Sequence, residues 1–193
     1  MAVSRRDHLV DTALELFHRD GFHATGIDRI LAESGVAKMT LYKHFKSKDE
    51  LILAALRRRD ERFRNWLMRE IERLDKTPRG RLLAVFDALA AYCEMRHFGG
   101  CFFVNAAAEY GSREDPIHVA AAEHKRLVFT YVRGLAAAAG AADADTLARQ
   151  ITLLMEGAIV TAYVAGIADT AGQAKDAAQI LIAAAIPPAS SAV

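Results

Sequence analysis

The stretch from Thr25 to Leu51 constrains the fold of this chain more than any other. Its apolar residues recur every three or four positions, which predicts two short helices, over residues 25–34 and 38–45. Gly35 lies between them and can adopt the left-handed conformation in which many helices end. A helix, a turn with glycine and a second helix form the helix-turn-helix pattern, whose second helix enters the major groove of DNA.

Positive charge gathers on the second of these helices. From Lys38 to Lys48 the chain has four lysines, one histidine and no acidic residue, although the net charge of all 193 residues is only +1. Such local charge suits a phosphate backbone, and the hydroxyls of Thr25, Thr40 and Tyr42 can donate to phosphates or base edges. Two ordinary helices with a solvated face would give a similar pattern, so these residues alone leave both interpretations open.

The same region carries a resemblance to a known family. The matching positions, all in register, are Gly21-Phe22, Thr25, Ile30, Gly35-Val36, Leu41-Tyr42, His44-Phe45, Ser47-Lys48 and Glu50-Leu51. They resemble the DNA-binding signature of the TetR/AcrR family of transcriptional regulators, over roughly the first quarter of the chain. Two positions depart from the commonest family pattern: Ala37 stands where a serine often caps the recognition helix, and Met39 stands where glycine is frequent.

The resemblance implies DNA contacts at eight residues. Phosphate contacts are expected at Thr25, Lys38, Tyr42, His44 and Lys48. Contacts with base edges are expected at Met39, Thr40 and Lys43. The resemblance also implies a helix-turn-helix DNA-binding domain over residues 1–48 and a ligand-binding and dimerisation domain over residues 49–193.

The whole chain is expected to be all-α, because no segment has the alternating pattern of a strand. Nine helices are predicted, over about residues 4–20, 25–34, 38–45, 47–74, from 77 to a break at 97–100, 101–110, 115–139, from 143 or 145 to 165, and from 169 or 170 to 186. Several starts have capping signals, among them Thr25, the capping box Ser47 to Glu50, and Thr77-Pro78. Arg57-Arg58-Arg59 is interpreted as a solvated face, and the tail from Ala189 to Val193 is expected to be disordered.

The last two helices suggest a homodimer. They are rich in alanine and contain Gly157 and Gly166, and their apolar character exceeds what one packed face needs. A four-helix bundle with two helices from each subunit would bury the excess, although core helices of a monomer are the alternative. In a dimer, two recognition helices about 34–36 Å apart would meet a palindromic operator in successive major grooves.

The middle of the chain is unusually aromatic, and the resemblance implies a ligand pocket there. Residues expected to line it are Phe63, Trp66, Phe86, Phe102, Phe103, Asn105, Tyr110, His118 and Phe129. Any one of these aromatic rings could instead serve only as packing. The expected effector is a small apolar or aromatic molecule that releases the protein from DNA, so that the chain acts as a repressor.

Cys101 raises a second possibility. It follows Gly99-Gly100 at a predicted helix start, where the helix dipole can lower the pKa of a thiol. The chain could therefore be a repressor that senses electrophiles or oxidants, or Cys101 could be a buried structural cysteine. A helical ligand-binding protein without DNA binding is a further alternative.

Other classes of protein are not indicated. The chain has no metal-ligand spacing, no phosphate-binding loop and no nucleophile elbow, so no enzyme, cofactor or metal site is expected. The most apolar run, Ile151 to Ala168, is interrupted by Glu156, and we interpret it as a buried helix rather than a membrane span. Only two cysteines and no secretory signal favour the cytoplasm.

Overall fold

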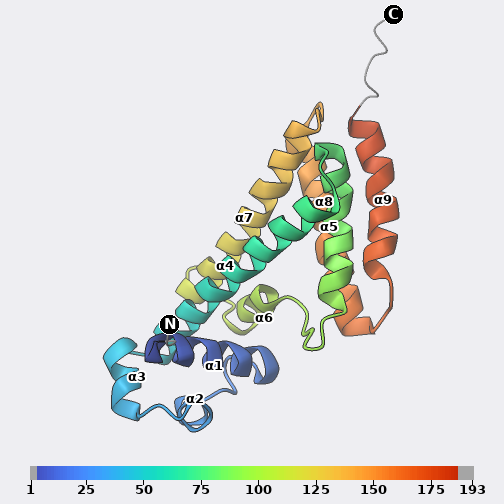
Figure 1. Cartoon of the computed structure of the whole chain (residues 1–193). Coiled ribbons are helices and arrows are strands. Elements are labelled where there is room, and N and C mark those ends of the chain that lie inside the picture. Colours follow the sequence, from blue (N-terminus) through green and yellow to red (C-terminus); the bar gives the residue numbers. More distant parts are fainter. Residues whose placement is uncertain (1–3, 187–193) are drawn as a thin grey trace, which may run out of the picture. The chain divides into compact units, whose positions relative to one another are not determined.

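The computed structural model describes residues 4–186, and within them it contains nine α-helices and no strand (Figure 1). In chain order the helices are α1 (Arg5–Asp20), α2 (Ile27–Ser34), α3 (Lys38–His44), α4 (Lys48–Leu74), α5 (Pro78–Cys93), α6 (Phe102–Glu109), α7 (Pro116–Ala138), α8 (Ala144–Ala165) and α9 (Thr170–Ala185). The predicted all-α class is confirmed. The tail from Ala189 to Val193 lies outside the described residues.

The helices form two compact units. Of the described residues, unit 1 combines 4–63 with 102–124, so it contains α1, α2, α3, α6 and the first parts of α4 and α7. Unit 2 combines residues 64–101 with residues 125–186 and contains the remaining helices. Two segments far apart in sequence therefore build unit 1, whereas the predicted functional division after residue 48 stays a prediction.

We call helices α1, α2 and α3 the head, and their apolar side chains form part of the core of unit 1. Its side chains come from the head, from α4 and from α6, so the head does not pack on itself alone. The largest fully buried residues of unit 1 are Leu9, Leu16, Phe17, Phe22, Ile30, Leu41, Leu51, Ile52, Leu56 and Phe102. Phe22 stacks at 5.3 Å from the ring of Phe17 and lies 4.9 Å from that of Phe102, measured between ring centroids.

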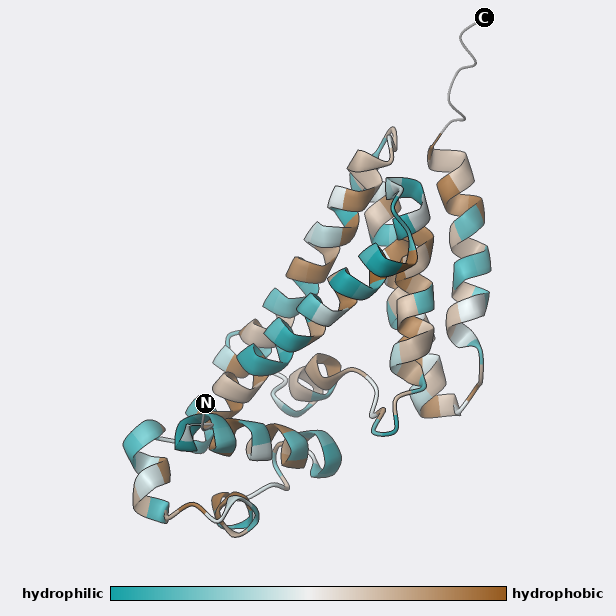
Figure 2. Ribbon diagram, in the orientation of Figure 1, coloured by the Kyte–Doolittle hydropathy of each residue, from teal (hydrophilic) through white to brown (hydrophobic). Residues whose placement is uncertain are grey.

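Unit 2 is a helical bundle in which α5 packs on both α8 and α9. Its fully buried core includes Leu67, Ile71, Leu82, Val85, Phe86, Leu89, Val132, Leu147, Ile151 and Ile182. Figure 2 shows that α5 is mostly apolar, whereas α4 is mostly hydrophilic. In residues 4–186 no helix combines the length and apolar character that a membrane span requires.

Helix ends follow the local signals in most cases. Thr77 accepts a hydrogen bond from the N–H of Gly80 ahead of Pro78, and Asp143 accepts one from the N–H of Thr146. The prediction that Thr25 caps α2 was wrong. Gly26 occupies the N-cap position, and the hydroxyl of Thr25 instead donates to the carbonyl of Gly21 at 2.7 Å.

Candidate nucleic-acid interface

The turn between α2 and α3 has the geometry of a helix-turn-helix. Gly35 closes α2 in the left-handed conformation, with φ 64°, and its N–H donates to the carbonyl of Leu31. Three residues later α3 begins, and the buried side chains of Leu41 and Phe45 hold it against the rest of unit 1. The position of α3 is thus fixed by its apolar side, which leaves its polar side facing solvent.

Six of the eight predicted contact residues lie on α3, and a seventh, Lys48, begins α4. Lys38, Met39, Tyr42, Lys43 and His44 are exposed, and Thr40 and Lys48 are partly exposed. Met39 is 83% exposed, an unusual position for a large apolar side chain. Together Met39, Thr40, Tyr42 and Lys43 line a surface groove of ≈ 450 Å³. This side of α3 combines cations, hydroxyls and one apolar group, which is the mixture that reads base edges and phosphates.

Thr25 is the exception among the eight. Thr25 is only 1% exposed, and its hydroxyl donates a hydrogen bond to the carbonyl of Gly21. The structure therefore does not present this side chain on the surface with the other seven.

Lys48 is also engaged within unit 1. Its ammonium donates to the backbone carbonyl of His23 at 3.2 Å. Burial lowers the pKa of Lys48, and the charge of nearby Glu109 partly opposes that shift. A role on phosphate would have to compete with this contact.

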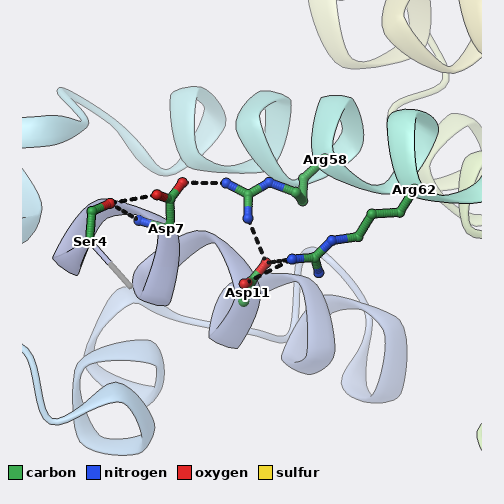
Figure 3. Close-up of polar contacts among 5 residues, drawn as sticks. All are labelled: Ser4, Asp7, Asp11, Arg58 and Arg62. Atoms are coloured by element: carbon green, nitrogen blue, oxygen red, sulfur yellow. Dashed lines mark hydrogen bonds and ion pairs between the residues drawn. The ribbon is translucent and has the colours of Figure 1, made fainter. Parts of the chain in front are cut away.

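The first turns of α1 are held against α4 by an ion-pair network (Figure 3). Arg58 pairs with Asp7 and, at 3.1 Å, with Asp11, while Arg62 pairs with Asp11 at 3.0 Å. Ser4 caps α1 by accepting from the N–H of Asp7 and donates to its carboxylate at 2.6 Å. The Ser4 hydroxyl, followed by the Arg58 guanidinium, lowers the pKa of Asp7 below its ordinary value.

The sequence indicated a solvated face at Arg57-Arg58-Arg59. For Arg58 this interpretation was wrong. Its side chain is only 21% exposed. The interpretation failed because the partners of Arg58 lie about fifty residues earlier, on another helix.

The residues predicted to bind a ligand do not all gather in one place. In unit 1, the ring of His124 stacks on Phe103 at 3.6 Å and meets Phe63 edge-on at 5.7 Å. Its Nδ1 lies 2.8 Å from the carboxylate of Asp60, so a buried histidine flanked by two of the predicted aromatic residues pairs with a partly exposed aspartate.

Other residues predicted to bind a ligand pack against Phe22, in the turn after α1. Phe102 and Tyr110 both contact Phe22, and Nδ1 of His118 lies 2.8 Å from the carbonyl of Tyr110. Asn105 is partly buried on α6. The sequence predicted neither the histidine–aspartate pair nor the packing against Phe22, since both join distant segments.

The remaining members lie in unit 2. Trp66 is 6.1 Å from Tyr92 between ring centroids, and Phe86 is fully buried in the core. Phe129 lines a separate groove of ≈ 460 Å³ between α7 and α8, together with Lys125, Arg126, Val128, Thr152, Leu153 and Glu156.

Cys101 adjoins this groove through Lys125. The ammonium of Lys125 lies 3.2 Å from Sγ of Cys101 and 2.6 Å from the carboxylate of Glu156. Burial disfavours the charge on Lys125, but its electrostatic interactions and hydrogen bonds with Cys101 and Glu156 outweigh this effect and raise its pKa. Cys93, the second free cysteine, is different, because burial and the nearby Glu94 raise the pKa of its thiol.

The fold and the exposed side of α3 define a helix-turn-helix protein with an all-α second part. Comparison with known proteins identifies the family. Residues 9–55 match the model described as bacterial regulatory proteins of the tetR family, and residues 78–178 match the tetracyclin repressor-like C-terminal domain. The chain therefore belongs to the TetR family of transcriptional regulators, whose name covers regulators and not enzymes.

A solved structure and two curated relatives illustrate the similarity. SCO4454, a TetR-family transcriptional regulator from Streptomyces coelicolor, superposes with a TM-score of 0.87 at 29% identity, covering 95% of this chain and 90% of that one. The transcriptional activator FasR of Mycolicibacterium smegmatis is 39% identical over 90 residues, 47% of this chain and 41% of FasR. The repressor KstR2 of the same organism is 33% identical over 98 residues, 49% of this chain and 46% of KstR2. These two matches span less than half the length of each relative.

Proposed function

We propose that this protein is a homodimeric repressor that binds a palindromic DNA operator and is released by a small apolar or aromatic molecule. The single observation that carries the proposal is the open side of α3, where Lys38, Met39, Thr40, Tyr42 and Lys43 are accessible. The cations suit phosphates, the threonine hydroxyl suits a base edge, and the methionine suits the methyl group of thymine. A regulator of this kind acts on the chromosome and hence in the cytoplasm.

The homodimer is supported by unpartnered apolar side chains on unit 2. Leu153, Val160 and Val164 follow one another at helical spacing along α8, and Leu153 and Val164 are 72% and 76% exposed. Ile180 on α9 is 72% exposed. Because α8 and α9 pack side by side within the chain, a second copy could bury both stripes in one four-helix interface.

Release from DNA requires differential affinity. An effector must stabilise a conformation in which the two copies of α3 no longer match the operator spacing. Aromatic residues near the His124–Asp60 pair offer an apolar surface with a polar group for such a molecule. KstR2 is named a repressor and FasR an activator. The two relatives thus differ in the direction of regulation, and repression by this chain is part of our proposal.

The test begins with selection of DNA fragments from a random pool by the purified protein. We expect enrichment of one palindrome, salt-sensitive binding to it, and loss of enrichment for a Tyr42→Ala/Lys43→Ala variant that folds normally. Wild-type protein that enriches no sequence, even at low ionic strength, would overturn the proposal in favour of a helical ligand-binding protein without DNA binding.

A second candidate function, sensing of electrophiles through Cys101, is favoured by one specific observation. The Lys125 ammonium within 3.2 Å of Sγ can stabilise a thiolate. In the proposed step, the thiolate attacks the β-carbon of an α,β-unsaturated carbonyl compound. A C–S bond forms, the carbon–carbon π electrons move into an enolate, and the α-carbon takes a proton from Lys125 or water, so no oxidant is needed.

The two cysteines supply a matched pair of variants for this candidate. With N-ethylmaleimide as the probe, wild-type protein and Cys93→Ser should be modified at Cys101 and lose operator binding, whereas Cys101→Ser should keep it. Equal release of Cys101→Ser would rule out this candidate and leave the effector-released repressor intact.

A further inference from the structure

The turn between α1 and α2 is bound by a carboxylate from a distant part of the sequence. Both oxygens of Glu109, at the end of α6, accept hydrogen bonds from this turn: one from the N–H of Phe22 at 2.8 Å, the other from the N–H of His23 at 2.6 Å. All these residues belong to unit 1. They are separated by more than eighty positions in the chain.

Both backbone polar groups of His23, its N–H and its carbonyl, form hydrogen bonds with side chains. The carboxylate of Glu109 accepts a hydrogen bond from the N–H of His23, and the ammonium of Lys48 donates one to the carbonyl of His23 at 3.2 Å. The imidazole of His23 stacks on Tyr110 at 4.7 Å, and its Nε2 lies 3.0 Å from the backbone carbonyl of Glu109. Such a combination leaves the turn little freedom to move separately from α6.

Gly21 makes the close approach of Glu109 possible. It has φ +89°, and a Cβ at this position would lie 3.2 Å from Oε1 of Glu109. A glycine here thus satisfies both the backbone conformation and the carboxylate, which indicates that the turn and α6 fit each other closely.

A carboxylate suits this position better than a neutral group. Two adjacent backbone N–H groups that follow α1 need acceptors, and an ionised carboxylate can accept from both at once with charge-assisted bonds. A glutamine offers only one carbonyl oxygen, and its NH₂ group would face the other N–H. Glu109 therefore holds the turn with a geometry that its amide analogue cannot reproduce.

We propose that Glu109 is a positioning residue for DNA binding. By joining α6 to the α1–α2 turn, it fixes the pose of the head and so the direction in which α3 meets the operator. The proposal rests on the proposed function, because a defined pose matters only if two heads bind two half-sites at a set spacing.

The first test measures the contact without DNA. Amide hydrogen exchange at Phe22 and His23 should be about tenfold faster in Glu109→Gln than in wild type, since a hydrogen bond to a charged group is lost. The matched control is Glu114→Gln, which changes an exposed glutamate in the loop after α6. Unchanged exchange at both amides in Glu109→Gln would overturn the proposal.

The second test measures how strongly DNA binding depends on the spacing between the two operator half-sites, because this dependence reports how firmly the head is oriented. The selected operator is rebuilt with its half-sites one base pair closer or farther apart, and binding of full sites and isolated half-sites is measured. Glu109→Gln should bind a half-site like wild type but discriminate several-fold less between spacings. A purely structural role would instead weaken binding to every site equally, and that result would overturn the proposal.

Failures of the two proposals remain distinguishable. Wild-type protein that binds no operator contradicts the proposed function. Wild-type binding with an unchanged spacing preference in Glu109→Gln contradicts only the positioning role. Should Glu109→Gln fail to fold, Glu109→Asp, which keeps the charge but shortens the reach, takes its place with the same expected relaxation of spacing.

Discussion

In the proposed function, single residues on α3 divide between those that contact a base edge and those that contact only phosphate. Thr40 is partly exposed and lines the same groove as Met39 and Lys43. Its hydroxyl is short, so it can reach only the base pair directly opposite. Exposed lysines have longer reach and less directional contacts.

Replacing Thr40 by alanine should relax sequence preference at one base position of each half-site. The expected loss is about 1–3 kcal/mol for the preferred base and close to zero for the others. Binding to a panel of single-base operator variants would measure it. Equal losses on cognate and random DNA would contradict the assignment of Thr40 to a base edge.

Replacing Lys38 by alanine should weaken binding to cognate and random DNA alike. Each lost phosphate contact flattens the slope of log K against log salt by about 0.9, hence by about 1.8 for the two heads of a dimer. A salt titration would measure the slope. Lys76→Ala provides the control, because this exposed lysine lies between α4 and α5 and donates to the carbonyl of Glu72. A slope that did not change in Lys38→Ala would exclude a phosphate contact there.

At the scale of helices, α3 is short and lacks a capping side chain. Its N-cap residue, Ala37, makes no side-chain hydrogen bond, although its extended conformation is the one a capping serine adopts. The helix therefore depends on the burial of Leu41 and Phe45 for its stability.

The substitution Ala37→Ser should stabilise the protein by about 1 kcal/mol, because the hydroxyl can accept from a backbone N–H in the first turn of α3. Urea unfolding would measure this change. Ala32→Ser, an exposed change inside α2, should instead destabilise slightly, by about 0.5 kcal/mol. A loss of stability in Ala37→Ser would show that the cap cannot form.

The contact between α1 and α4 should make stability sensitive to acid. Because the pKa of Asp7 is lower in the folded chain than its ordinary 3.8, the ionised form favours folding. Its contribution is fully present above pH 3.8 and is lost as the pH falls through the folded value. Urea midpoints measured across this range should fall more steeply for wild type than for Asp7→Asn. Identical pH profiles would contradict the role of the network.

For the whole molecule, the exposed apolar stripes of α8 and α9 are the main departure from an ordinary surface. Separate Leu153→Glu and Ile180→Glu variants should be monomeric at micromolar concentration, because a buried charge would be introduced on each side of the proposed interface. Sedimentation velocity would measure the state. Val119→Glu is the matched control, since Val119 on α7 is 51% exposed but lies in unit 1. A monomeric wild type, or a dimer in all three variants, would argue against this interface.

How much could be predicted from the sequence depended on the distance between interacting residues. The glycine turn at Gly35 and the cap at Thr77 each depend on residues within one helical turn, and these predictions were confirmed. The accessibility of the six predicted contact residues on α3 also follows from the local helical period of that helix. The buried position of Thr25 was missed because its hydroxyl has an alternative acceptor in the preceding segment.

The sequence by itself thus determined the helices, the family and the side chains of the proposed recognition surface, because periodicity, caps and a contiguous motif are local properties. Only the tertiary structure decided that Arg58 binds Asp7 and Asp11, that His124 pairs with Asp60, and that Glu109 holds the turn at His23. Those pairs join helices separated by tens of residues. Side chains brought together by packing have no fixed spacing along the chain, so no local pattern can predict them.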